Sequence, residues 1–107
     1  MGDAFDQRED GFEKRFAMNE ALRFKALARR NKQLGLWAAA LLGQSGEAAE
    51  AYADALVARQ VGREDDALAA DLASQFAAAG VDLSAHRLQR KIAETLAEAL
   101  ASVQAGR

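Results

Sequence analysis

The stretch SAHRLQRKIAETLAEALASVQ, residues 84–104, decides the fold class of this chain. Its large apolar side chains are Leu88, Ile92, Leu96, Leu100 and Val103. Apolar residues that recur about every four positions lie along one face of an α-helix, with polar residues between them. Asp82 or Ser84 can cap the first turn of that helix. The stretch therefore predicts an amphipathic helix over 84–104 whose apolar face packs against other helices.

The rest of the chain carries the same helical signals. Its 107 residues include no proline and no cysteine, and alanine, the best helix former, is the commonest residue. The glycines at positions 43, 46, 62 and 80 each follow or precede an alanine-rich run, as glycines at helix ends do. They predict helices near 5–42, 46–61, 63–79 and 84–104. Because the connections are short, we predict an all-α, four-helix bundle with antiparallel neighbours.

Periodic apolar residues also predict which faces of the first three helices are buried. The expected core positions are Phe24, Leu27, Leu34, Ala38 and Leu41 in the first helix, Tyr52 and Leu56 in the second, and Leu68, Leu72 and Phe76 in the third. Asn31 takes one intervening position of the first stripe, and Trp37 lies at its flank. Together with the last helix, these stripes predict a single core.

The first predicted helix is too long for the bundle. At 1.5 Å per residue it measures about 57 Å, whereas the other three measure roughly 25–30 Å. In DAFDQREDGFEKRF, residues 3–16, the side chains of Phe5, Phe12 and Phe16 fall within about 40° of one another on a helix. Gly11 weakens that helix by about 1 kcal/mol relative to alanine. We predict a flexible N-terminal arm, residues 1–19, that is disordered or frayed when free, and a bundle over 20–107.

Three uses of the phenylalanines on the N-terminal arm stay open at this point. They can enter a groove of a foreign partner as an amphipathic helix, which is the hypothesis we favour. They can instead join two copies of the chain, or fold back onto the bundle.

Composition excludes several chemistries. Without cysteine there is no disulfide and no thiolate nucleophile or ligand, and a reducing cytosol is expected. The longest apolar run, GLWAAALLG, is too short to span a membrane. The acidic N-terminus does not resemble a signal peptide. No phosphate-binding loop, metal-ligand motif or nucleophile–base pair is visible, and His86, the single histidine, is expected to be partly buried or capping. We predict that the protein is not an enzyme and holds no metal.

The stretch RFKALARRNK, residues 23–32, is basic. Lys25, Arg29 and Lys32 project opposite Phe24 and Leu34, and Leu36 joins the same outer side. We call Lys25, Arg29, Lys32 and Leu36 the basic face and predict that it is a secondary docking surface for an acidic protein. A solvated helix face and a nucleic-acid patch that also uses Arg30 are the alternatives. The net charge of −2 and the lack of an aromatic platform weigh against nucleic acid.

Four strings in the sequence resemble the ATPase inhibitor subunit zeta family of bacteria. They are FDQRE at 5–9, FEKRF at 12–16, FKALARRNKQLGLWAA at 24–39 and GVDLSAHRLQRK at 80–91. The resemblance spans nearly the whole chain. It implies a four-helix bundle with an inhibitory N-terminal segment that enters an α/β catalytic interface of the F-type ATP synthase, near the γ subunit. That segment blocks ATP hydrolysis and permits synthesis.

The resemblance also implies where the activity lies in this chain. By position, the inhibitory segment is Met1–Asn19, and its candidate contacts are Phe5, Arg8, Glu9, Phe12, Lys14 and Phe16. The implied partners are the α, β and γ subunits, met by a monomer at the cytoplasmic side of the inner membrane without membrane insertion. No cofactor is expected, although weak adenine-nucleotide binding on the bundle is implied for some members. The alternative function is a helical regulatory bundle that binds nucleic acid or senses a nucleotide.

Overall fold

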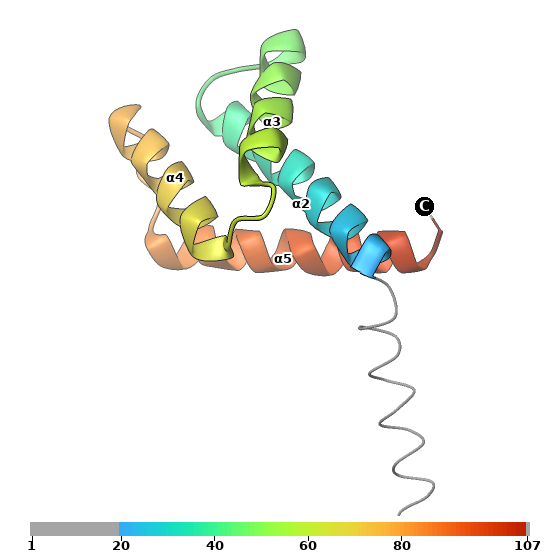
Figure 1. The fold of residues 1–107 in the computed structure, drawn as a ribbon. Helices are drawn as coiled ribbons and strands as arrows, with labels where there is room; N and C mark the ends of the chain where they lie inside the picture. The colour runs from blue at the N-terminus through green and yellow to red at the C-terminus, as the bar shows by residue number, and fades with distance from the viewer. Residues whose placement is uncertain (1–19, 107) are drawn as a thin grey trace, which may run out of the picture.

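The computed structural model describes residues 20–106, and these residues form four α-helices (Figure 1). The helices are α2 (Glu20–Leu41), α3 (Gly46–Gln60), α4 (Asp65–Ala78) and α5 (Ala85–Gln104). The prediction of an all-α, four-helix fold is confirmed, and the ends predicted for the last three helices agree to within about two residues. The N-terminal arm lies outside the described residues. Within 20–106 no helix is both long enough and apolar enough to cross a membrane.

Glycines end the helices where the sequence predicts. After α4, Gly80 has a φ of +73°, a left-handed conformation that side chains larger than hydrogen rarely adopt. This turn lets the Val81 amide donate to the Phe76 carbonyl at 2.8 Å, which satisfies a free carbonyl at the helix end. The chain then enters α5, whose first turn is capped by Ser84: its Oγ accepts from the Arg87 amide at 3.1 Å. Of the two predicted caps, Ser84 is the one that forms this bond.

The helices do not pack as four equivalent neighbours. Helix α2 packs against both α3 and α5, while α4 packs mainly against α5. In Figure 1, α5 lies across the base of the bundle, and α3 and α4 diverge above it. The short α3–α4 connection therefore joins two helices that touch through long side chains rather than through closely packed backbones. Here the expectation that short connections give close antiparallel pairs is only partly right.

Most of the predicted core is buried. One cluster contains Leu34, Ala38, Leu56, Leu68, Leu72, Phe76, Leu88 and Ile92, and all of these were predicted core positions. Each large side chain removed from water in this way stabilises the fold by roughly 1.5–3 kcal/mol. A second, smaller cluster joins Ala26 to Ala99 and Val103, where α2 crosses α5. The bundle is therefore held by a large cluster of bulky side chains and a small cluster of short ones.

Two predicted core positions in the first helix are wrong. Phe24 and Leu41 are 59% and 41% exposed. Both residues lie near the ends of α2: Leu41 is its last residue, just before the connection to α3, and Phe24 lies in its second turn, beside the end of α3. At these positions the neighbouring helices cover less of α2 than they do around Leu34 and Ala38.

The buried face of α5 also departs from the predicted stripe. Leu96 and Leu100 are half-buried, while Thr95 and Ala99 are buried in their place. An α-helix turns 100° per residue, so a strict spacing of four drifts by about 40° at each step. The buried positions correct the drift with one step of three, from Ile92 to Thr95. Thr95 Oγ1 is satisfied within the helix, because it donates to the Lys91 carbonyl at 2.7 Å.

Candidate functional site

The side chains predicted to contact a partner fall into two groups, of which the structure describes one. The arm residues Phe5, Arg8, Glu9, Phe12, Lys14 and Phe16 lie outside residues 20–106 and remain predictions. The basic face lies on α2 and is described in full.

The basic face forms an outer ridge of α2 between α3 and α5. Lys25 is exposed near the start of the ridge. Arg29 turns toward α5 and donates from Nη1 to Ser102 Oγ at 2.5 Å. Lys32 turns toward α3, where its Nζ lies 2.5 Å from Glu50 Oε2 and 2.6 Å from Asp54 Oδ1. Leu36 is half-buried beside the start of α3.

The Lys32 ammonium is thus engaged by its own chain. The hydrogen bonds to Asp54 and Glu50 raise the pKa of Lys32 above its usual value. All three side chains remain partly in water, where water screens such pairs and they add little to stability. A partner that recruits Lys32 has to displace these two carboxylates, so Lys25 is the member of the basic face most open to an incoming acid.

Arg30 does not lie on an accessible surface, contrary to the nucleic-acid alternative that included it. Its side chain is 2% exposed. Nη2 lies 2.7 Å from Asp65 Oδ1 at the start of α4, and Nε donates to Asn31 Oδ1 at 2.7 Å. A buried guanidinium needs such partners, because removing one leaves an uncompensated charge. Arg30 therefore ties α2 to α4 and has no free surface to offer a phosphate.

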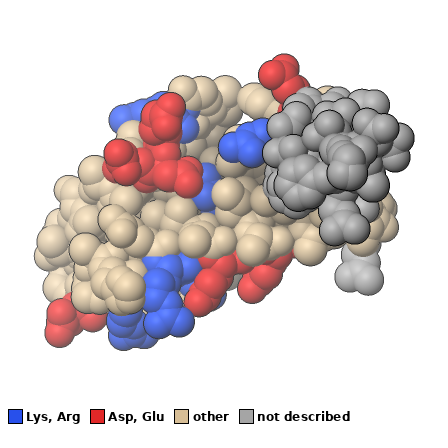
Figure 2. Space-filling view, turned by 90° about the horizontal axis from the view of Figure 1, so that it is seen from below, with Lys and Arg blue, Asp and Glu red and all other residues tan. Residues whose placement is uncertain are grey.

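Charge on the side where α5 lies is mixed rather than continuous. Figure 2 shows basic side chains in separate groups there, each near acidic ones, with uncharged surface between them. A protein that tracks a nucleic-acid backbone presents a stripe of one sign. The described residues on this face form no such stripe.

A polar network joins α3 to α4. Arg59 Nε lies 2.7 Å from Asp71 Oδ2, and Gln75 Nε2 donates to the other Asp71 oxygen at 2.8 Å. The Tyr52 hydroxyl completes the chain by donating to Gln75 Oε1 at 2.5 Å. Burial alone would raise the pKa of Asp71, but the hydrogen bonds from Arg59 and Gln75 outweigh it and hold this pKa below its usual range. Burial raises the pKa of Tyr52, which stays a neutral donor.

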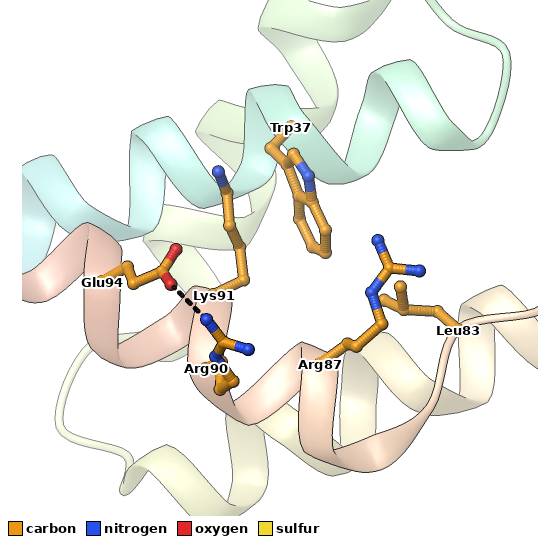
Figure 3. A pocket seen from close by; sticks show the side chains of 6 residues that line it. All are labelled: Trp37, Leu83, Arg87, Arg90, Lys91 and Glu94. Atoms are coloured by element: carbon orange, nitrogen blue, oxygen red, sulfur yellow. Dashed lines mark ion pairs between the residues drawn. The ribbon is translucent and has the colours of Figure 1, made fainter.

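The most distinctive concave surface among the described residues is the Trp37 pocket, a hollow of about 330 Å³ between α2 and α5 (Figure 3). Its lining residues are Trp37, Leu83, Arg87, Arg90, Lys91 and Glu94. The Trp37 ring packs edge-on against Phe76, with the ring centroids 5.8 Å apart. Lys91 Nζ lies 5.6 Å from the Trp37 centroid, within cation–π range. Three cations thus face one acid, Glu94, which pairs with Arg90 at 3.6 Å.

This pocket was not predicted from the sequence. Its signal was present, because Arg87, Arg90 and Lys91 stand at positions i, i+3 and i+4 of one helix face. What the sequence did not indicate is that this face meets Trp37.

His86, which was expected to be partly buried or capping, is exposed, and that expectation is wrong. Ser84 does the capping, so the imidazole has no packing role in the first turn of α5.

In residues 20–106 no group of three or more His, Asp or Glu side chains could hold a metal ion. The features that this part of the chain presents are a basic ridge, a cationic pocket beside an indole ring and an apolar cleft described below. The fold and these surfaces define the class of protein as a small all-α bundle whose surface features suit contact with other molecules.

The family model of ATPase inhibitor subunit zeta matches residues 1–102 of this chain. Because the match covers nearly the whole sequence, the chain belongs to this family, and the resemblance found in the four sequence strings is confirmed. The family's name makes it an inhibitor subunit of an ATPase, a regulatory protein. No curated protein sequence matches the chain.

Proposed function

We propose that this chain inhibits ATP hydrolysis by an F-type ATP synthase, with residues 1–19 entering an α/β catalytic interface near the γ subunit. The observation that carries the proposal is the family match, which begins at residue 1 and so includes the N-terminal arm. The core clusters of residues 20–106 are consistent with it, because they join side chains from Ala26 to Val103 across all four helices. In this proposal the arm serves the partner rather than that core.

The mechanism is that of a wedge. A helix lodged between the α and β subunits opposes closure of the catalytic site, so rotation in the hydrolysis direction stalls. Rotation in the synthesis direction opens the same interface and releases the helix. The contacts proposed on the arm are Phe5, Arg8, Glu9, Phe12, Lys14 and Phe16. The three phenylalanines supply apolar anchors, in which interface energy concentrates.

The bundle remains outside the α/β catalytic interface in this mechanism. It acts as a monomer at the cytoplasmic side of the membrane and needs no cofactor. Lys25 is available to meet acidic groups of the synthase, while Arg29 and Lys32 are held toward α5 and α3. Exposed charges of this kind speed association more than they strengthen the complex.

The proposal is tested with inverted membrane vesicles that contain the synthase. Added full-length chain should lower ATP hydrolysis in a saturable manner, and ATP synthesis driven by a proton gradient should fall far less. An α, β and γ subunit set should also be captured by the tagged chain from a membrane extract. Equal loss of hydrolysis and synthesis would exclude a directional wedge, and no loss of either would exclude the inhibitor function for this chain.

The Trp37 pocket favours a second function, weak sensing of an adenine nucleotide. Arg87, Arg90 and Lys91 can neutralise phosphates, and the indole ring of Trp37 can contact a purine (Figure 3). Trp37 is the single tryptophan of the chain, so its fluorescence reports on this pocket alone. Titration with ADP or ATP should change the emission at millimolar concentration. The double variant Arg87→Gln, Arg90→Gln should abolish the change, and an unaltered response in that variant would place the nucleotide elsewhere.

A further inference from the structure

An apolar cleft lies between the start of α2 and the end of α3. It shares no lining residue with the Trp37 pocket. Its lining residues are Phe24, Leu27, Ala28, Arg30, Asn31, Val57, Gln60, Val61, Gly62 and Arg63. We call it the α2–α3 cleft. Its volume is about 170 Å³, and a cavity of about 150 Å³ is enough to hold benzene. The cleft therefore has room for one aromatic or branched aliphatic side chain.

Two features of the cleft are unfavourable in the free protein. Phe24 and Val61, on opposite sides of it, are each 59% exposed and are the two most exposed of the large apolar side chains in residues 20–106. In addition, Gln60 is 3% exposed, and its Oε1 has no hydrogen-bond partner within that range. Scattered exposed apolar residues need no explanation, but here two of them flank one hollow. Together they suit an apolar group of a partner, which would cover both side chains.

The position of the cleft indicates which molecule supplies that group. Phe24 lies four residues after Glu20, where the described chain begins and to which residues 1–19 connect. If α2 continues toward the N-terminus as a helix in the complex, Phe16 lies about 12 Å from Phe24 along the axis, within about 20° of Leu27 around it. The ATPase surface that binds Phe16 would then lie next to the cleft. Phe16, Leu27 and Phe24 would form one apolar side that continues into the cleft.

A second copy of this chain fits the cleft less well. A stable symmetric dimer buries about 800 Å² on each partner, whereas a cleft for one side chain with two flanking residues offers far less. We therefore infer that the α2–α3 cleft is a second docking site for the ATPase, which takes an apolar side chain of the subunit beside the arm between Phe24 and Val61. This inference rests on the proposed function, because binding of the N-terminal arm to the ATPase would place the cleft next to that subunit.

The test compares full-length variants as inhibitors of ATP hydrolysis. Phe24→Ser and Val61→Ser together should raise the concentration of protein needed for half-inhibition about tenfold or more, because the apolar contacts on both sides of the α2–α3 cleft are lost. Leu41→Ser is the matched control: Leu41 is 41% exposed at the opposite end of the same helix, and this variant should inhibit within about twofold of the parent. Melting temperatures of the parent and both variants should agree closely, because none of the three side chains is in the core.

Each alternative occupant gives a different result. If the double variant inhibits like the parent, the cleft is no docking site and the inference is wrong, while the proposed function stands. If the parent sediments as a dimer that the double variant dissociates, the occupant is a second copy. If Phe12→Ala with Phe16→Ala in the full chain speeds amide exchange at Val57 and Gln60 in the free protein, the arm itself fills the cleft, and the inference is again wrong. A parent that does not inhibit overturns the proposed function and the inference together.

Discussion

The two ends of α2 differ in how they are held. In its second half, the side chains of Leu34 and Ala38 are fully buried and belong to the large core cluster. Near its start, the small side chain of Ala26 packs on α5, while Phe24 points largely into solvent. Stability therefore concentrates in the second half of the helix, and unsatisfied apolar surface concentrates in the first. This division predicts that substitutions in the second half of α2 and its core cluster lower the free energy of unfolding. Substitutions toward the N-terminus should instead weaken inhibition.

The largest expected effect is on stability, in the large core cluster to which the second half of α2 contributes Leu34 and Ala38. Leu72→Ala removes a fully buried side chain from the large cluster and should lower the free energy of unfolding by about 3 kcal/mol, with a range of roughly 2–5. In a domain of this size that corresponds to a fall in melting temperature of more than about 10 °C. Calorimetry measures this change. At a temperature where the variant is folded, its inhibition of ATP hydrolysis should match the parent, and a parallel loss of inhibition would show that the two ends are not separable.

The next effect is expected on binding, at the opposite end. Phe12→Ala with Phe16→Ala should weaken inhibition by about 30- to 1000-fold, or about 2–4 kcal/mol, because these rings are proposed as anchors in the ATPase. The melting temperature should hardly change. An assay of ATP hydrolysis and a thermal melt of the same sample measure both. Unchanged inhibition with a much lower melting temperature would mean that the rings pack on the bundle.

A pair of glycines sharpens the comparison further. A Cβ at Gly35 would lie 2.7 Å from Ala53 Cα, so Gly35→Ala forces α2 and α3 apart and should cost about 1–3 kcal/mol of stability. Gly11→Ala, on the arm, should instead strengthen inhibition by about fivefold, because alanine lowers the cost of forming a helix on docking by about 1 kcal/mol. Denaturant melts and inhibition assays of both variants measure the two effects. Weaker inhibition by Gly11→Ala would mean that the bound arm is not helical at that residue.

The smallest effect is the pH dependence of the α3–α4 network. The pKa of Asp71 is lower in the folded protein than its ordinary value of 3.8, so the carboxylate stabilises the fold above that pH. The stabilisation is lost as the pH falls through the folded pKa. Asp71→Asn should therefore lower stability at pH 7 slightly and flatten its decline in acid. Melting curves between pH 7 and pH 2 measure this, and parallel curves for the two proteins would assign the acid sensitivity to other groups.

Much of the fold was predictable because its signals are local. Glycines mark the helix ends, and within each helix the large apolar residues recur with helical spacing, so the burial of Leu34, Leu56, Leu72 and Leu88 follows from the sequence. The arrangement of the helices was less predictable, because it depends on contacts between distant residues. The pairing of Arg30 with Asp65 joins positions 35 residues apart, and neither side chain differs in sequence from an ordinary surface residue.

The candidate site was predictable to a smaller extent. The family strings indicate the inhibitory arm, and the structure describes none of its contacts. The basic face was foreseen as a set of residues, but the engagement of Lys32 by Glu50 and Asp54 depends on how α3 packs. The Trp37 pocket and the α2–α3 cleft each combine residues from two helices, and periodicity within one helix does not indicate which neighbour it meets.

The most direct measurement is a comparison of the full chain with residues 20–107, each tested for cooperative unfolding and for inhibition of ATP hydrolysis. We expect the shortened chain to unfold in one transition within a few degrees of the full chain, because residues 20–106 contain both core clusters. We expect it to leave ATP hydrolysis uninhibited at concentrations where the full chain inhibits completely. If residues 20–107 inhibit as strongly as the full chain, or fail to fold, the separation of a stable bundle from an inhibitory arm is contradicted.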